Sequence, residues 1–130
     1  MTDPHSLGGA ALAYIGDAVL ELLIREKLIA CGVTDTGKLS AKAQTLVCAP
    51  AQSERLEKIL PCLTEEENAA FHLGRNHKTQ AKPKHSSVME YRRATGFEAI
   101  FGWVYMSGNN ERMRELFSLA FDESDFSNIL

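Results

Sequence analysis

The apolar residues of this 130-residue chain recur at helical spacing along nearly its whole length, and strict alternation of β-branched and polar residues is absent. Short breaks containing glycine, proline or asparagine separate the periodic segments. The pattern therefore predicts an all-α fold of about six or seven helices and no sheet. We expect the six clearest helices over residues 6–30, 38–48, 51–60, 64–75, 87–106 and 110–121.

Length and composition predict one globular domain. The chain is too short for two ordinary domains, and its 45% hydrophobic and 24% charged residues are typical of globular proteins. We expect a single domain over residues 1–130, with its core at about 7–121 and a frayed acidic tail at 122–130. The most apolar stretch, residues 10–24, is too short to span a bilayer, so we expect no membrane partner.

The three cysteines are Cys31, Cys48 and Cys62. They are odd in number and widely spaced, which favours neither a disulfide framework nor paired zinc ligands. Free thiols suit a reducing compartment, and we therefore expect a cytoplasmic protein.

Basic charge is concentrated in one segment. Residues 72–93 contain six lysines and arginines against one acid, a net charge of +5, whereas the whole chain carries −3. A basic segment on an otherwise acidic protein indicates a surface for an anionic partner. The segment is centred between the fourth and fifth predicted helices, where we expect a surface loop that carries three of the six basic residues.

The first predicted helix carries a narrow charged stripe. Between residues 10 and 25 the only charged side chains are Asp17, Glu21 and Arg25, each four positions apart and therefore on one line of the helix. One hypothesis is a ladder of ion pairs exposed to solvent. The other is that Asp17 is buried, and since an unpaired buried carboxylate is costly, it then needs a cation or a hydrogen-bond donor.

The fifth predicted helix has a similar arrangement. Glu98 is the only charged side chain among residues 94–106, which are otherwise mostly apolar. Glycines near both acids would let the two helices approach closely, and the carboxylates would then converge on an open site of the kind magnesium favours. The alternative is that Glu98 is a surface acid at the edge of a core helix. The glycines in question are Gly16, Gly96 and Gly102.

Two other patterns do not support the sites they suggest. Residues 32–38 read G-x-x-x-x-G-K, but Leu39 replaces the hydroxyl residue of a phosphate loop and a helix replaces the preceding strand, so we expect no nucleotide cofactor. The histidines His72, His77 and His85 lack the spacing of a zinc site. Contact with phosphate or a nucleic-acid groove is the better interpretation for them.

The segments LAYIGDAVLE (residues 12–21) and YRRATGFEAIFGWVY (91–105), with GRNHK (74–78) before the second, resemble the signature of the ribonuclease III catalytic domain. The resemblance covers about residues 7–121. It is closer still to the short form, Mini-ribonuclease III, which lacks a separate domain for binding double-stranded RNA.

The resemblance implies that Asp17 and Glu98 are the essential magnesium ligands, with manganese able to substitute, and that Glu21 has a supporting role. Full-length ribonuclease III carries two further acids where this chain has Ala13 and Thr95, so the implied set of metal ligands is smaller here. The implied reaction is metal-assisted hydrolysis of double-stranded RNA by a homodimer, with the apolar face of the first helix as a candidate dimer surface. The short form further implies a precursor of large-subunit (23S) ribosomal RNA as substrate.

A catalytic domain without a separate binding module must contact the duplex itself, mainly through phosphates and 2′-hydroxyls. We assign this contact to the basic segment, although each lysine could equally be an ordinary surface charge. Two alternatives remain: a catalytically silent RNA-binding subunit of a ribosomal or RNA-processing particle, and a helical adaptor that binds an acidic protein. The expected RNA contacts are Arg75, Asn76, Lys78, Lys82 and Lys84, followed by Arg92 and Arg93.

Overall fold

The computed structural model describes residues 2–77 and 86–127 of the chain. Within these ranges there are six α-helices, three short 3-10 helices and no strand, which confirms the all-α prediction. No described helix combines the length and the apolar character needed to cross a membrane. The α-helices are α1 (Gly9–Ala30), α2 (Thr36–Val47), α3 (Ala49–Ile59), α4 (Glu65–Arg75), α5 (Val88–Met106) and α6 (Asn110–Ala120), and the 3-10 helices are η1 (Pro4–Ser6), η2 (Leu60–Cys62) and η3 (Glu123–Phe126).

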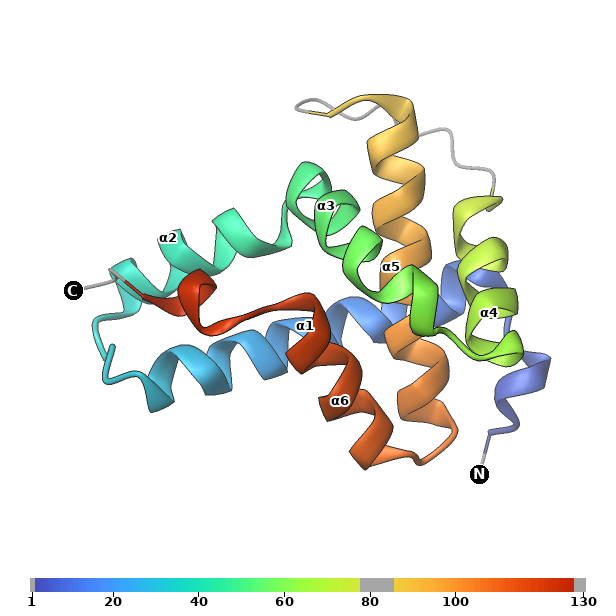
Figure 1. Cartoon of the computed structure of the whole chain (residues 1–130), viewed down its shortest axis with the longest axis horizontal. Helices are drawn as coiled ribbons and strands as arrows, with labels where there is room; N and C mark the ends of the chain where they lie inside the picture. Colours follow the sequence, from blue (N-terminus) through green and yellow to red (C-terminus); the bar gives the residue numbers. More distant parts are fainter. Residues whose placement is uncertain (1, 78–85, 128–130) are drawn as a thin grey trace.

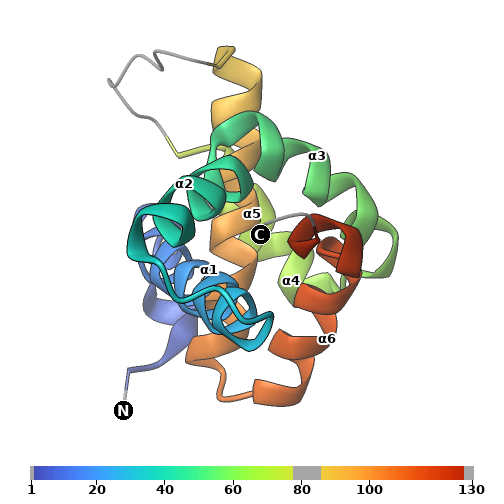
Figure 2. The same ribbon diagram turned by 90° about the vertical axis from the view of Figure 1, so that its left-hand side faces the viewer.

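Helix α5 is the central element of the fold. Figures 1 and 2 show the other helices arranged around it, and its most extensive packing is with α1, followed by α4 and α3. Phe97 and Phe101 of α5 are fully buried, together with leucines and isoleucines from the surrounding helices. Between residues 94 and 104 α5 is buried on nearly every side, so Glu98, the only charged residue of this stretch, lies close to the core.

Side-chain caps explain where several helices begin. Thr64 and Glu67 form a capping box at the start of α4, and Ser87 and Glu90 form the same arrangement at the start of α5. Helix α2 begins two residues earlier than expected, because the Asp35 carboxylate accepts a hydrogen bond of 2.9 Å from a backbone N–H of its first turn. These differences at helix ends leave the topology unchanged.

The acidic tail differs from expectation within its described part. Residues 123–126 form η3, and Phe126 packs into the main core with only 4% of its surface exposed. Asp125 forms an ion pair with Arg55 of α3, and Glu123 accepts a hydrogen bond of 2.9 Å from Lys27 of α1. The expectation of a frayed end is therefore wrong for residues 122–127, because long-range contacts fasten this segment to the body.

Candidate active site

Helices α1 and α5 cross with their backbones in direct contact. A Cβ atom placed on Gly16 would lie 1.7 Å from the carbonyl oxygen of Glu98, and one on Gly102 would lie 1.9 Å from that of Leu12. Both distances are far shorter than any real contact, so only glycine fits at these positions. Because Asp17 directly follows Gly16, the crossing places its side chain beside Glu98. Gly96, by contrast, provides close contact with Phe71 of α4.

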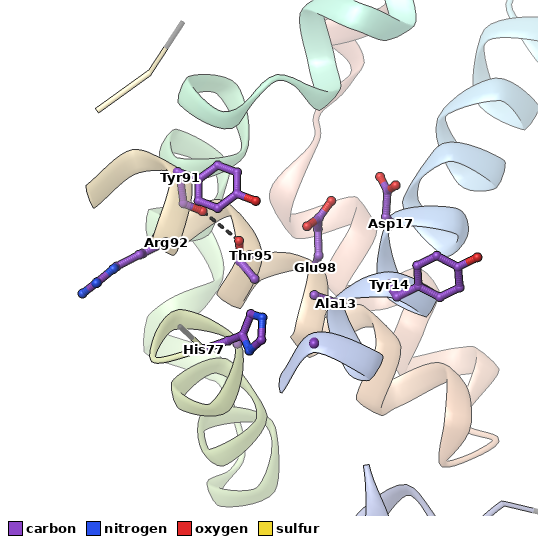
Figure 3. A pocket seen from close by; sticks show the side chains of 10 residues that line it. Ala13, Tyr14, Asp17, His77, Tyr91, Arg92, Thr95 and Glu98 are labelled. Carbon is purple, nitrogen blue, oxygen red and sulfur yellow. Dashed lines mark hydrogen bonds between the residues drawn. The ribbon is translucent and has the colours of Figure 1, made fainter. Parts of the chain in front are cut away.

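Asp17 and Glu98 line one open pocket at this crossing. The pocket has a volume of about 240 Å³, and Figure 3 shows the two carboxyl groups side by side, one carried by α1 and the other by α5. The fold thus brings together two acids that are far apart in the sequence. The other lining residues are Ala10, Ala13, Tyr14, Gly74, His77, Tyr91, Arg92 and Thr95.

The two acids differ in their surroundings. Asp17 is exposed, which agrees with the first of the two hypotheses for the charged stripe and not with the second, whereas Glu98 is half-buried against the core. Burial raises the pKa of Glu98 to about 9, and both repulsion from the Asp17 carboxylate and a hydrogen bond between the two side chains act in the same direction. Without a cation, the pair therefore favours the form in which Glu98 holds a proton.

The donor set fits a divalent cation that keeps much of its water. Two carboxylates from facing helices offer hard oxygen ligands, and a positive ion between them would remove the repulsion that raises the pKa of Glu98. In the described ranges, no group of three or more His, Cys, Asp or Glu side chains is placed to hold a metal ion. Water and substrate oxygens would have to complete the coordination.

Ala13 and Thr95, which replace two acids of the family that the sequence resembles, supply no further carboxylate. Ala13 lines the pocket without a polar side chain, and the Thr95 hydroxyl donates a hydrogen bond of 2.9 Å to the carbonyl oxygen of Tyr91. The dashed line in Figure 3 marks this bond. The hydroxyl proton of Thr95 is thus committed to its own helix.

Glu21 lies apart from this pocket. It forms an ion pair of 3.2 Å with Arg25, one turn further along α1, and both residues line a separate groove next to α2. The ion-pair hypothesis for the charged stripe therefore describes Glu21 and Arg25. Of the charged residues in the stripe, only Asp17 lies beside Glu98.

The predicted RNA contacts fall into three groups. Arg92 is exposed and lines the pocket, whereas Arg93 turns to α3 and donates to the Ser53 hydroxyl at 2.9 Å. At the end of α4, the Arg75 guanidinium lies over the ring of Phe71 and donates a 3.2 Å hydrogen bond to the side chain of Asn76. The third group lies outside the described residues and consists of Lys78, Lys82 and Lys84.

The sequence analysis missed Gln52 of α3. Hydrogen bonding from its side chain lowers the pKa of Glu98, against the stronger effect of burial. A signal was present, because Gln52, Leu56 and Ile59 share one face of the helix and the other two are core residues. An amide at a core position indicates a buried polar partner.

The chain is similar to several known proteins over most of its length. Residues 10–109, which include both acids, match the family model of the ribonuclease III domain. The chain is 38% identical over 122 residues to a Mini-ribonuclease 3 of Symbiobacterium thermophilum, with 94% of each protein covered. It is 40% identical over 118 residues to a Mini-ribonuclease 3 of Enterococcus faecalis, with 89% of each covered. A crystal structure of a Fusobacterium nucleatum protein matches with a TM-score of 0.83 at 29% identity, covering 92% of this chain and 98% of that one.

Proposed function

Since the chain belongs to the ribonuclease III family, in its short Mini-ribonuclease III form, it is an endoribonuclease, and we propose that it uses magnesium at Asp17 and Glu98 to cleave double-stranded regions of precursor large-subunit (23S) ribosomal RNA. The observation that carries the proposal is the meeting of these two carboxylates at the α1–α5 crossing. The ribosomal substrate rests on the resemblance to the short form. Free thiols at the three cysteines are in keeping with a cytoplasmic location.

Asp17 and Glu98 would hold the cation between α1 and α5. When bound, a divalent cation supplies activation of a water molecule and neutralisation of charge on the scissile phosphate. The backbone contact between the helices fixes the spacing of the two carboxylates, so little reorganisation is needed when the cation enters. The reaction needs no covalent protein nucleophile.

The residues around the acids suit a polyanionic substrate. Arg92 and His77 line the pocket, and both are exposed, so they can reach a phosphate that approaches Asp17. Arg75 and Asn76 lie immediately before His77 and extend the same surface. We assign to these side chains the phosphate and 2′-hydroxyl contacts that a duplex requires.

We further propose that the enzyme is a homodimer, so that two active sites can each cut one strand. The support is an exposed apolar face on α1, where Tyr14, Leu22 and Ile29 are 83%, 66% and 56% exposed. Exposed large apolar side chains gathered on one helix face indicate an interaction surface. Sedimentation equilibrium would test this, because Leu22→Glu should convert a dimer into a monomer.

The decisive experiment is cleavage of a long RNA duplex by the purified protein with magnesium or manganese, and with chelator. We expect cutting only with metal, and its loss in Asp17→Asn and Glu98→Gln with folding and duplex binding retained. If the wild-type protein retains the duplex in a gel shift without cutting it, the chain is a silent RNA-binding subunit instead. If it does neither, a helical adaptor becomes the better interpretation.

The basic segment is tested separately. Replacing Lys82 and Lys84 with glutamate should weaken duplex binding and flatten its dependence on salt concentration, since fewer counterions are released per complex. Unchanged binding across the salt series would exclude these two lysines from the RNA contact.

A further inference from the structure

Gln52 is a buried amide with a core location. Its side chain lies on the inward face of α3, and only 3% of the residue is exposed. Among the described residues, Gln52 and Glu67 are the only buried ones that are polar or charged. Burying an amide is costly unless hydrogen bonds compensate, so this position calls for a polar partner inside the fold.

The surroundings identify that partner as Glu98. Helix α3 packs on α5, and the register between them is fixed by Arg93, which donates to the hydroxyl and the carbonyl oxygen of Ser53 at 2.9 and 3.2 Å. Ser53 is the neighbour of Gln52, and Glu98 lies little more than one turn beyond Arg93 in α5. The side chains of Gln52 and Glu98 are hydrogen-bonded, and because a carboxylate oxygen accepts, the amide N–H group of Gln52 is the donor.

Gln52 does not line the pocket that Asp17 and Glu98 share. It therefore approaches Glu98 from the protein interior, while the pocket side of the carboxylate stays open. A carboxylate has two oxygens, so one can accept from the amide while the other faces the pocket.

We propose that Gln52 is a positioning residue, which holds the Glu98 carboxylate in the orientation that binds the divalent cation. The inference rests on the proposed metal-dependent function. Glutamate has three rotatable side-chain bonds, and fixing them costs free energy unless a partner defines the rotamer. No acid is available at Ala13 or Thr95 to share the task, and the Thr95 hydroxyl is bonded to the Tyr91 carbonyl. The amide of Gln52 fixes the rotamer of Glu98 instead.

The test compares Gln52→Met with the wild-type protein. Methionine has nearly the same length and volume but cannot donate to a carboxylate. Partners that orient metal ligands typically contribute about 10–100-fold in metal affinity or activity, so we expect Mn²⁺ binding, measured by calorimetry, to weaken by about tenfold or more. The manganese concentration that gives half-maximal cleavage should rise in parallel, while KM for the duplex at saturating manganese stays unchanged.

Gln44→Met is the matched control, because Gln44 is exposed on α2 and lines the separate groove beside Glu21 and Arg25 instead of the pocket of the two acids. It should bind manganese like the wild type. If Gln52→Met does not fold, Gln52→Asn keeps the amide but shortens it by one methylene, and we expect the same weakening of Mn²⁺ binding.

Three results would overturn the inference. Wild-type Mn²⁺ affinity in the folded Gln52→Met or Gln52→Asn protein would show that Gln52 is only a core residue. A lowered melting temperature without any change in Mn²⁺ binding would lead to the same conclusion. A wild-type protein that neither binds Mn²⁺ nor cuts RNA would refute the proposed function itself, and the inference with it.

Discussion

Gly16 of α1 packs directly against the backbone carbonyl of Glu98 in α5, so closely that a side-chain carbon on Gly16 would lie 1.7 Å from that oxygen. Asp17, the residue that follows Gly16, places its side chain beside that of Glu98. The closest approach of the two longest helices and the candidate active site are therefore one feature. A change in helix spacing at this point changes the distance between the two carboxylates.

Gly16→Ala should therefore damage both stability and activity. The added methyl group forces α1 and α5 apart, and overpacking of this kind costs about 1–3 kcal/mol or more of the free energy of unfolding. The rate of duplex cleavage should fall by more than the loss of folded protein explains, because Asp17 moves away from Glu98. Urea unfolding and duplex cleavage measured under folding conditions test both effects.

Gly8→Ser is the matched control for this substitution. Gly8 is the N-cap of α1, has a φ of −82°, and has no neighbouring atom within 4 Å of the position that a Cβ would occupy. Serine is favoured at an N-cap, so stability should stay the same or rise slightly. Wild-type stability and cleavage in Gly16→Ala would show that the helices can separate without consequence.

The burial of Glu98 predicts an unusual dependence of stability on pH. Its pKa is raised from 4.5 to about 9 in the native protein, so the native state keeps a proton that the unfolded chain releases. Without metal, the stability of the wild type relative to Glu98→Gln should therefore fall as pH rises from about 4.5 to about 9, and level off above it. Denaturant unfolding with chelator at a series of pH values measures this difference.

Divalent metal should reverse the order of stability of the wild type and Glu98→Gln. Wild type should gain stability when manganese is added at pH 8, because the cation favours the ionised pair, whereas Glu98→Gln should gain little. Glu21→Gln serves as the control, since Glu21 pairs with Arg25 away from the pocket. A wild-type protein as stable as Glu98→Gln at every pH without metal would contradict the raised pKa.

The helices were predictable because their signals are local. Apolar spacing, the Thr64 and Ser87 caps and the short breaks all lie within a few residues of the elements that they define. The convergence of Asp17 and Glu98 could also be anticipated, because Gly16 adjoins Asp17 and Gly102 lies about one turn from Glu98 in otherwise apolar helices. The pattern could not give the exposure of Asp17, which depends on how far α4 and α5 cover that side of α1.

Gln52 and the tail were missed because their partners are distant in the sequence. Gln52 acquires its role only when α3 packs on α5, and Asp125 finds Arg55 only when the chain has folded back on itself. Neither contact has a local sequence pattern. A polar residue at a core position of a helix remains the best sign of such a partner.

Because η3 packs against the core, we expect Phe126 to contribute to the free energy of unfolding. Its ring is buried among Phe117 and Phe121, and removal of a buried phenylalanine side chain costs about 3–5 kcal/mol. Because η3 is a 3-10 helix of only four residues, which can detach without unfolding the α-helices, we expect Phe126→Ala to cost less than that, about 2–3 kcal/mol. Thermal unfolding measures the effect.

Leu119→Ala provides the comparison, since Leu119 of α6 is 46% exposed. Its melting temperature should change little. Equal melting temperatures for wild type and Phe126→Ala would mean that η3 is detached in solution, as the sequence alone indicated.

Arg92 and Arg93 are adjacent in α5 but should respond differently to the same substitution. Arg92 lines the pocket and is exposed, so Arg92→Gln should weaken duplex binding and reduce the slope of log K against log salt by about 1, with the melting temperature unchanged. Arg93 is hydrogen-bonded to Ser53 and paired with Glu57, so Arg93→Gln should cost about 1 kcal/mol of stability.

Each variant is the control for the other, because both lose one positive charge from the same helix. Binding measured by gel shift from low to high salt, together with urea unfolding, separates the two effects. If both variants reduced the salt slope equally without loss of stability, Arg93 would leave α3 to contact the duplex, and the structural role assigned to it would be wrong. If neither reduced the slope, the RNA would approach the acidic pair from another side, leaving Arg75 and the 78–85 segment as its basic contacts.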